Sequence, residues 1–425
     1  MKKTLQEQFK NRKIKKPNKL LAKIVIWAFS CISKKRGVSF VYENDYKELE
    51  NKQVIYLCQH KSLDDFYYVF AGMKRTDVHV LCGMQNVFQK YFYTLLKHLG
   101  VIAKYLYQPD MLAIKQMRQV VDFGGSLAIF PEGIQSTSGS THPINPTTFK
   151  YVFKQGLPVV LVSLKGSYFT RTRYSKDVKK GKITVTFSKL FGVEDFKNYS
   201  QEELYNRLIE RFSYNEFLEF SGEKVEFIGK KPNIDGLDNI IYKCPECLAE
   251  GAFKIDSDQM YCTRCGFKVK MNNCYELLPI SKNLPFKNTD EWYKWQRSVI
   301  KNEILSNDFL LNAKVKIATV NPYKITDNYS LLYIGEGVLT LTNKGLTYVG
   351  TRNGENVTLF FEPNSLYSLS MSLSYEFDFY YKNEYFNFKL LENEKLMAKW
   401  TIASEEIHNL YDEKWKKVSD EVYKC

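Results

Sequence analysis

The chain has 425 residues, a net charge of +14 and an apolar content of 44%. This length exceeds one ordinary hydrophobic core, and the apolar fraction excludes wholesale disorder. The charge is uneven, because residues 1–36 hold ten lysines and two arginines against one acid, Glu7. We therefore expect a basic arm that tethers a nearly neutral body to an anionic surface, either lipid headgroups or nucleic acid.

Within this arm, residues 20–33 read LLAKIVIWAFSCIS and are followed by more basic residues. Such a segment is too short to cross a bilayer comfortably. We predict a helix in the membrane interface, with Trp27 and Phe29 at the acyl boundary and lysines at the phosphates. Two alternatives stay open. One is a secretory signal peptide, although no clear small-residue cleavage site follows, and the other is a core helix of the next domain.

The next predicted domain, residues 37–238, begins by alternating short β-rich runs with helical runs. Strands are predicted at 38–42, 54–58, 78–82, 100–105, 126–130, 159–164 and 182–187. Helices are predicted at 63–73, 86–98, 110–121, 148–154 and 200–211, the last opened by a capping box from Ser200 to Glu203. This alternation indicates an α/β fold with a largely parallel or mixed sheet.

A histidine and an aspartate stand where one predicted strand gives way to a helix, in the segment QHKSLDD at 59–65. His60 is expected in the loop and Asp65 on the first helical turn. Across such a junction the carboxylate can fold back onto the imidazole, fix its tautomer and support it as a general base. Alone the spacing is weak evidence, because Ser62 to Asp65 also resembles a helix capping box, with His60 as a polar loop residue.

Three further segments accompany it. FPEG at 130–133 ends a predicted strand and places a carboxylate and a backbone N–H at the sheet edge where ligands bind in α/β folds. LPVVLV at 157–162 is a buried strand entered through a proline, and HLGVI at 98–102 is a helix-to-strand joint. An ordinary turn or strand would explain each one alone. In this order and spacing, the four segments resemble the 1-acylglycerol-3-phosphate acyltransferase family over about residues 38–215.

The resemblance implies a glycerolipid acyltransferase-like domain with a mixed sheet. His60 would remove the proton from an acceptor hydroxyl, which attacks the thioester of an acyl-CoA or acyl-carrier-protein donor, while Asp65 orients His60. Glu132, Gly133 and Ser136 would contact the acceptor, a lysophospholipid similar to lysophosphatidic acid, in phospholipid biosynthesis. From geometry we expect a backbone N–H around Gly133 to stabilise the oxyanion. The protein would be peripheral or monotopic on the cytoplasmic face of a membrane.

The sequence departs from the family at two phosphate-binding positions. The family usually continues FPEG with Thr-Arg-Ser, whereas residues 134–136 are Ile-Gln-Ser, and Lys104 stands near the place of the second block's arginine. Arginine grips a phosphate bidentately, which a neutral glutamine cannot do. Either Lys104, Lys150, Arg171 or Arg173 supplies the contact, or the acceptor is a different lysolipid. The plain alternative for the two arginines is a solvated hairpin.

Two C-x-x-C pairs follow the acyltransferase-like domain. The first pair is Cys244 and Cys247, and the second is Cys262 and Cys265. Fourteen residues separate the pairs, and Gly266 follows the second one. This pattern predicts a zinc ribbon at 239–285 with a closed, structural Zn²⁺ site and no catalytic role. A pair of reactive dithiols is the alternative. Because the spacing of these cysteines indicates metal binding rather than disulfides, we expect the protein in a reducing cytoplasm.

The last part of the chain is expected to hold a helical connector at 286–312 and a β-rich domain at 313–425. GEGVLTLTNKGLTYVG from Gly335 predicts a hairpin, and a second hairpin turning at 382–383 should have one apolar and one wet face. A closing helix should begin near Ser404, and its apolar stripe should contain Ile407, Leu410, Tyr411 and Trp415. Strands closed by one helix resemble a PH or GRAM-type domain.

The main rival to an enzyme is a membrane-tethered zinc-ribbon scaffold or a nucleic-acid-binding protein. A phosphate-binding module should be basic, whereas residues 244–265 hold more acids than bases, so no nucleic-acid partner is expected. The expected partners are an anionic membrane surface, the lysophospholipid and the acyl donor. A protein partner for the ribbon or for the β-rich domain stays open.

Overall fold

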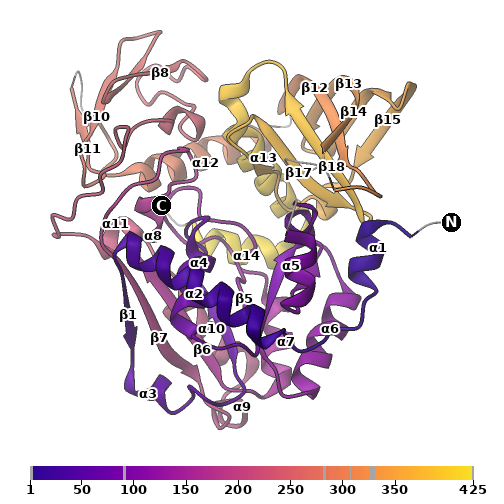
Figure 1. Ribbon diagram of the computed structural model, residues 1–425. Helices are drawn as coiled ribbons and strands as arrows, with labels where there is room; N and C mark the ends of the chain where they lie inside the picture. The colour runs from indigo at the N-terminus through magenta and orange to yellow at the C-terminus, as the bar shows by residue number, and fades with distance from the viewer. Residues whose placement is uncertain (1–2, 90–91, 281–283, 307, 326–330, 424–425) are drawn as a thin grey trace.

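The computed structural model describes residues 3–89, 92–280, 284–306, 308–325 and 331–423. We divide it into an N-terminal region (3–238), a ribbon (239–280) and a C-terminal region (284–423). Figure 1 shows the N-terminal region in the lower part of the view, with the ribbon and the C-terminal region above it. Each region has its own sheet.

The N-terminal sheet has seven strands in the order β1-β7-β6-β2-β5-β3-β4. Its strands are β1 Val38–Tyr42, β2 Ile55–Cys58, β3 Val78–Gly83, β4 Ile102–Lys104, β5 Ser126–Ile129, β6 Val159–Lys165 and β7 Ile183–Phe191. All neighbouring pairs are parallel except β6 with β7, so the predicted mixed sheet is confirmed. The central strands β2 and β5 are buried on both faces, which explains their nearly continuous apolar sequences.

Helices cover both faces of this sheet. One face packs against α6 Met111–Asp122, α7 Pro146–Gln155 and α10 Gln201–Phe212, and the other against α3 Asn44–Lys47 and α4 Asp65–Met73. The predicted capping box opens α10. The predicted helix at 86–98 is wrong as one element, since a 3₁₀ turn at Met84–Phe88 precedes α5 Phe92–His98, and residues 90–91 lie outside the described residues. The short helices are α8 Ser167–Thr170, α9 Asp195–Asn198 and α11 Glu216–Glu219.

The basic arm is partly folded into the protein. It contains α1 Leu5–Lys10 and α2 Lys19–Arg36. Phe9 is fully buried, the Lys10 ammonium pairs with the buried Asp110 carboxylate, and Arg12 donates to the carbonyl of Val101. The N–H of Leu5 donates to the carbonyl of Pro322 in the C-terminal region at 2.7 Å. The first half of the arm is therefore part of the folded protein, and its role as a tether to an anionic surface stays a prediction.

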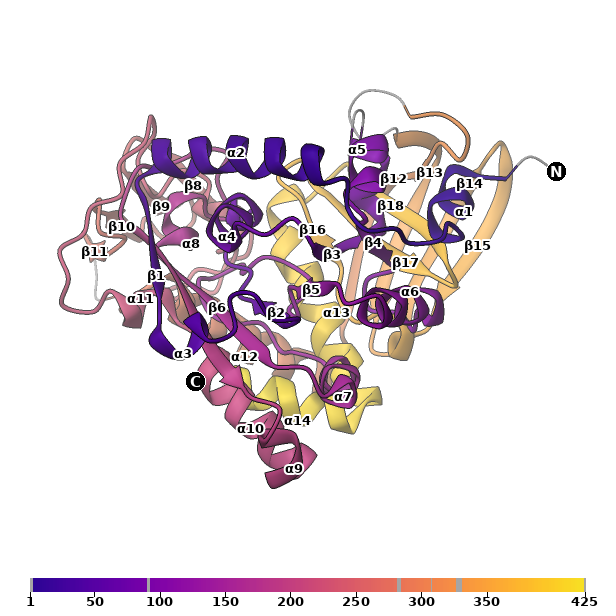
Figure 2. The same cartoon turned by 60° about the horizontal axis from the view of Figure 1, so that its bottom comes forward.

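The second half of the arm is the surface helix α2, which lies along the outside of the molecule over α4 (Figure 2). Phe29 packs edge-to-face on Phe66 and Tyr67 of α4, so its predicted place at the acyl boundary is wrong. The opposite side of the helix exposes large apolar side chains, with Trp27 at 69%, Leu20 at 71% and Ile24 at 53%. Within the described residues, no helix has the length and apolar character needed to span a membrane.

The ribbon is a four-stranded antiparallel sheet in the order β11-β10-β9-β8, formed by β8 Phe253–Asp256, β9 Gln259–Cys262, β10 Lys268–Met271 and β11 Leu277–Pro279. The predicted connector helix is α12 Thr289–Leu305. Its Trp292 is fully buried, with its ring centroid 5.5 Å from that of Phe253 and 6.0 Å from that of Phe267. The connector is therefore a core helix of the ribbon, and its predicted end at 312 falls inside β12.

The C-terminal region holds a seven-stranded antiparallel sheet in the order β15-β14-β13-β12-β18-β17-β16. Its strands are β12 Leu310–Val320, β13 Leu331–Thr342, β14 Gly345–Arg352, β15 Glu355–Phe361, β16 Ser370–Met371, β17 Glu376–Tyr381 and β18 Glu384–Leu390. Both predicted hairpins are confirmed. The likeness to a PH or GRAM-type domain stays a prediction.

Two expectations for this region are wrong. The closing helix begins earlier, as α13 Met397–Tyr411, and breaks at Asp412, which caps α14 Glu413–Val422. Because of this break, Ile407 and Trp415 are buried while Leu410 and Tyr411 are exposed. The second hairpin also lacks a wholly wet face, because Tyr380 packs on Tyr105 of the N-terminal region, with ring centroids 4.9 Å apart.

Candidate active site

The predicted histidine and aspartate meet at the carboxyl end of β2. Nδ1 of His60 lies 3.1 Å from Oδ2 of Asp65. The Asp65 carboxylate also accepts the N–H of Ser62 at 2.7 Å and the hydroxyl of Ser167. An ionised carboxylate only accepts hydrogen bonds, so Nδ1 carries a proton, and in the neutral imidazole the lone pair is on Nε2. The Ser62–Asp65 hydrogen bond of the alternative capping box is present, but α4 begins only at Asp65 and has no side-chain cap, and the same carboxylate oxygen also contacts the imidazole.

Glu132 fixes the backbone of the histidine loop. Its side chain is buried, with Oε1 accepting the N–H of His60 at 2.8 Å and Oε2 accepting the N–H of His142 and the hydroxyl of Tyr214, both at 3.0 Å. Burial raises the pKa of Glu132 to about 8, against the three donors that favour its ionised form. Glu132 thus supports His60 directly, and its contact with an acceptor stays a prediction.

The loop after Glu132 is built for a tight turn. Gly133 has a φ of 79°, and its N–H donates to the carbonyl of Phe130 at 3.1 Å. That N–H is already used in the turn, and an oxyanion role for another backbone N–H around Gly133 stays a prediction. Ser136 is fully buried, and its hydroxyl donates to the carbonyl of Ser140 at 2.7 Å. The N–H of Ser136 donates to the carbonyl of His60 at 2.9 Å, whereas a substrate contact of Ser136 stays a prediction.

The cationic candidates lie in different surroundings. Arg171 pairs with Asp64 at 2.5 Å, and Lys150 is exposed on α7. Nζ of Lys104 lies 3.3 Å from the carbonyl oxygen of Tyr105, and burial lowers the pKa of this lysine. The structure connects Arg173 to the histidine through Gln135.

Gln135 is the site residue that sequence reasoning recorded only as a departure from the family. Its Nε2 lies 3.3 Å from Nε2 of His60, and its Oε1 accepts a hydrogen bond of 2.5 Å from Arg173. Ser167 is a second residue of the site without a predicted role, and its hydroxyl contacts Asp65. The position of Gln135 two residues after FPEG, where the family places an arginine, was the available signal.

The C-terminal region reaches this loop at several points. Oδ1 of Asp290 on α12 accepts the hydroxyls of Ser138 and Ser140 at 2.6 and 2.7 Å. Nδ1 of His142 lies 2.9 Å from the hydroxyl of Tyr423. The loop that follows Glu132 is therefore held from both halves of the chain.

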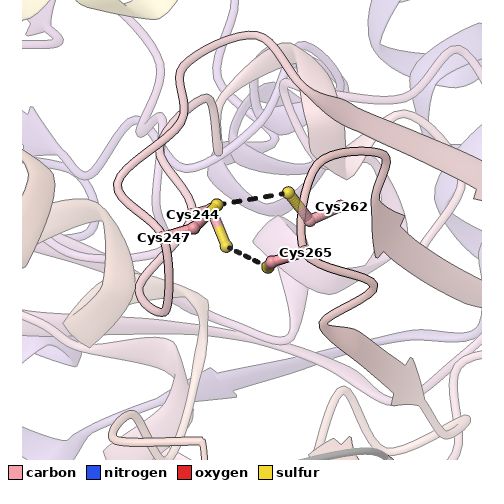
Figure 3. Close-up of side chains that lie close together, drawn as sticks. All are labelled: Cys244, Cys247, Cys262 and Cys265. Carbon is pink, nitrogen blue, oxygen red and sulfur yellow. Dashed lines mark hydrogen bonds between the residues drawn. The ribbon is translucent and has the colours of Figure 1, made fainter.

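The four predicted metal cysteines converge in the ribbon, as Figure 3 shows. Their sulfur atoms all lie within 4.8 Å of one another, with 3.7 Å between Cys244 and Cys265 and between Cys247 and Cys262. Thiolates bound tetrahedrally to zinc at the usual Zn–S distance lie about 3.8 Å apart. The four cysteines therefore fit a structural zinc ion.

An imidazole hydrogen-bonded to a buried carboxylate, at the carboxyl end of a mixed α/β sheet, is an arrangement in which a histidine can act as a general base. Residues 39–165 match the protein family described as Acyltransferase, and this part of the chain is an acyltransferase domain.

The chain is similar to two curated 1-acyl-sn-glycerol-3-phosphate acyltransferases. It is 26% identical to the one from Cocos nucifera over 170 residues, or 38% of this chain and 52% of the relative. It is 23% identical over 186 residues to one described as probable from Mycoplasma genitalium, or 43% of this chain and 65% of the relative. The chain thus spans between half and two thirds of the length of these relatives.

Among solved structures, the chain is similar to the 1-acyl-sn-glycerophosphate (LPA) acyltransferase PlsC from Thermotoga maritima. The TM-score is 0.36 and the identity 17%, covering 45% of this chain and 77% of that one.

Proposed function

We propose that this protein transfers a fatty acyl chain from a thioester donor, acyl-CoA or acyl-carrier protein, to the hydroxyl of a lysophospholipid. The observation that carries the proposal is the 3.1 Å contact between His60 and the buried Asp65. The family match over residues 39–165 and the two similar acyltransferases support the same reaction class.

The reaction needs one base and no covalent intermediate on the protein. Nε2 of His60 takes the proton of the acceptor hydroxyl, and the oxygen attacks the thioester carbonyl. Asp65 accepts the Nδ1 hydrogen bond and stabilises the imidazolium that forms. The tetrahedral intermediate then expels the thiolate, which takes the proton back from Nε2, leaving the new ester and neutral His60.

The acceptor that the charges favour is an anionic lysolipid such as lysophosphatidic acid. The side-chain amide of Gln135 contacts both His60 and Arg173, so Arg173 lies near the base. Arg171 and Lys104 are further candidates for contacting the phosphate of the acceptor. Guanidinium groups bind phosphates bidentately, which favours Arg171 over Lys104, while both terminal nitrogens of Arg173 already donate to Gln135 and to β16. Glu132, Gly133 and Ser136 shape the loop beside this place.

Membrane binding would bring the lipid acceptor to the site. The exposed row of Leu20, Ile24 and Trp27 on α2 has lysines beside it, including the exposed Lys19 and Lys23. An amphipathic helix of this kind lies in the interface of an anionic bilayer. We place the protein at the cytoplasmic face of a membrane, with its ribbon holding a structural zinc ion.

The decisive experiment is a screen of purified protein with radiolabelled acyl-CoA or acyl-carrier protein against a panel of lysophospholipids. We expect acyl transfer to at least one anionic lysolipid, with lysophosphatidic acid tested against lysolipids that carry larger headgroups. Transfer should disappear in His60→Ala. A protein that transfers no acyl chain from either donor, yet binds RNA or DNA tightly and in a salt-dependent way, would contradict the proposal.

A further inference from the structure

Gln135 stands between the candidate base and a guanidinium. Its Nε2 is 3.3 Å from Nε2 of His60, and its Oε1 is 2.5 Å from a terminal nitrogen of Arg173. An arginine can only donate hydrogen bonds, so the amide oxygen must face Arg173. The amide N–H group then faces His60, and Nε2 of the imidazole must accept.

This orientation agrees with the other side of the ring. Asp65 accepts the hydrogen bond of Nδ1, which also leaves the lone pair of His60 on Nε2. Two independent partners therefore select the same neutral tautomer and fix the plane of the imidazole. The lone pair that they preserve is the one a general base uses.

Arg173 is held in turn by the C-terminal region. Its second terminal nitrogen donates to the hydroxyl of Ser370 at 3.2 Å and to the carbonyl of Met371 at 2.8 Å, both on β16. Among the described residues, no carboxylate pairs with this guanidinium within 4.0 Å. The three hydrogen bonds to neutral oxygens therefore set its position.

We propose that Gln135 and Arg173 are positioning residues that couple the C-terminal region to the base: β16 holds Arg173, Arg173 holds the amide of Gln135, and the amide aims Nε2 of His60. The inference rests on the proposed function, in which His60 is the base. It assigns the C-terminal region a part in the turnover of the acyltransferase domain. The acceptor hydroxyl takes the place of the amide on Nε2 during catalysis.

The kinetic test uses four variants of the full chain and one matched control. Gln135→Ala and Arg173→Lys should each lower kcat about tenfold, and Ser370→Ala about threefold. KM should be nearly unchanged, because these variants disturb the orientation of the His60 imidazole and leave substrate binding intact. Gln135→Glu should lower kcat at least about a hundredfold, since its carboxylate accepts a hydrogen bond only from a protonated Nε2 and so favours the imidazolium, which has no lone pair. Ser365→Ala, an exposed serine in the same region, should leave kcat unchanged.

A double-mutant cycle separates this relay from a direct contact between Arg173 and the acceptor. If Arg173 acts through Gln135, then Arg173→Lys adds almost nothing in the Gln135→Ala background. If Arg173→Lys raises KM strongly and equally in both backgrounds, the guanidinium binds the acceptor directly and the relay is wrong.

A spectroscopic test works without turnover, so it separates failure of the relay from failure of the proposed function. The chain has five histidines, and the protein labelled with ¹⁵N-histidine should show His60, assigned with His60→Gln, as a neutral ring protonated at Nδ1. In Gln135→Glu, both ring nitrogens of His60 should be protonated at the same pH. An unchanged His60 signal in this variant would overturn the relay, whatever the acyltransferase assay gives.

Discussion

Asp65 and His60 meet across the junction of β2 and α4 with very different exposure. The Asp65 side chain is completely buried, whereas the His60 side chain is 16% exposed, and 3.1 Å separates Oδ2 from Nδ1. The Asp65 carboxylate is therefore shielded from solvent, whereas the His60 imidazole is partly accessible. A carboxylate that is shielded from water keeps its hydrogen bonds with the protein, and its bond to Nδ1 therefore fixes the orientation of the imidazole ring.

Removing either member of this pair should abolish most of the acyl transfer. We expect His60→Ala and Asp65→Asn to lower kcat by about 10²–10⁴-fold, because general-base catalysis or the orientation of the base is lost. Initial rates with saturating donor and lysolipid measure this effect. Circular dichroism must show an intact fold, and full activity of His60→Ala would contradict the assignment.

The buried Glu132 should make stability depend on pH. Because burial raises its pKa to about 8, the folded protein keeps a proton there that the unfolded chain has released, so this group's contribution to the free energy of unfolding falls as the pH rises from about 5 to about 8. Glu132→Gln cannot titrate. Urea unfolding across this range should therefore show a steeper loss of stability in the unmodified protein than in Glu132→Gln, and parallel profiles would contradict the prediction.

The ribbon should contain one zinc ion per chain. Metal analysis of purified protein measures this ratio, and Cys262→Ser should lose the ion. Since zinc binding contributes folding free energy and Phe267 and Trp292 pack beside the site, the variant should unfold at a lower temperature, by about 2–4 °C for each kcal/mol lost. Cys274→Ser, outside the four-cysteine cluster, is the control. If the purified protein is well folded and contains almost no metal, the prediction of a zinc site in the ribbon is wrong.

Binding to anionic vesicles should depend on the exposed row of α2. Ile24→Glu combined with Trp27→Glu should weaken flotation with vesicles at least about tenfold, because burying such side chains contributes about 1.5–3 kcal/mol each. Val349→Glu is a matched control, since Val349 and Ile24 are both 53% exposed. Equal binding of the variants would refute membrane docking through α2. Deleting residues 1–36 is a poor test, because it also removes the buried Phe9 and Lys10.

Local patterns predicted the strands and helices of the N-terminal region well. Period-two and helical periodicities are properties of short segments, and β1 Val38–Tyr42 and α10 Gln201–Phe212 follow them closely. The meeting of His60 with Asp65 was also predictable, because only five positions and one strand-to-helix junction separate them. The four zinc cysteines were predictable for the same reason, since each pair sits in one turn.

The remaining parts of the site depend on contacts between distant segments. Nothing in the sequence around Arg173 indicates that Ser370 will hold it, and nothing near Phe9 indicates that a basic arm will be buried against β4 and the C-terminal region. Such contacts form between segments that are far apart in the sequence, and they depend on how well the surfaces of two folded regions fit each other. The break at Asp412 was missed because the apolar spacing on either side of it continues as in one helix.

The hydrogen bond between His142 and Tyr423 has a consequence for synthesis of the protein. A ribosome makes the loop beside His60 early, but it releases Tyr423 only after more than four hundred residues. The sheet that carries His60 can form on the growing chain, whereas its loop gains the support of Tyr423 only after the C-terminal region has been made. A chain that still lacks the C-terminal region should therefore hold a folded N-terminal sheet whose loop beside His60 is incompletely supported.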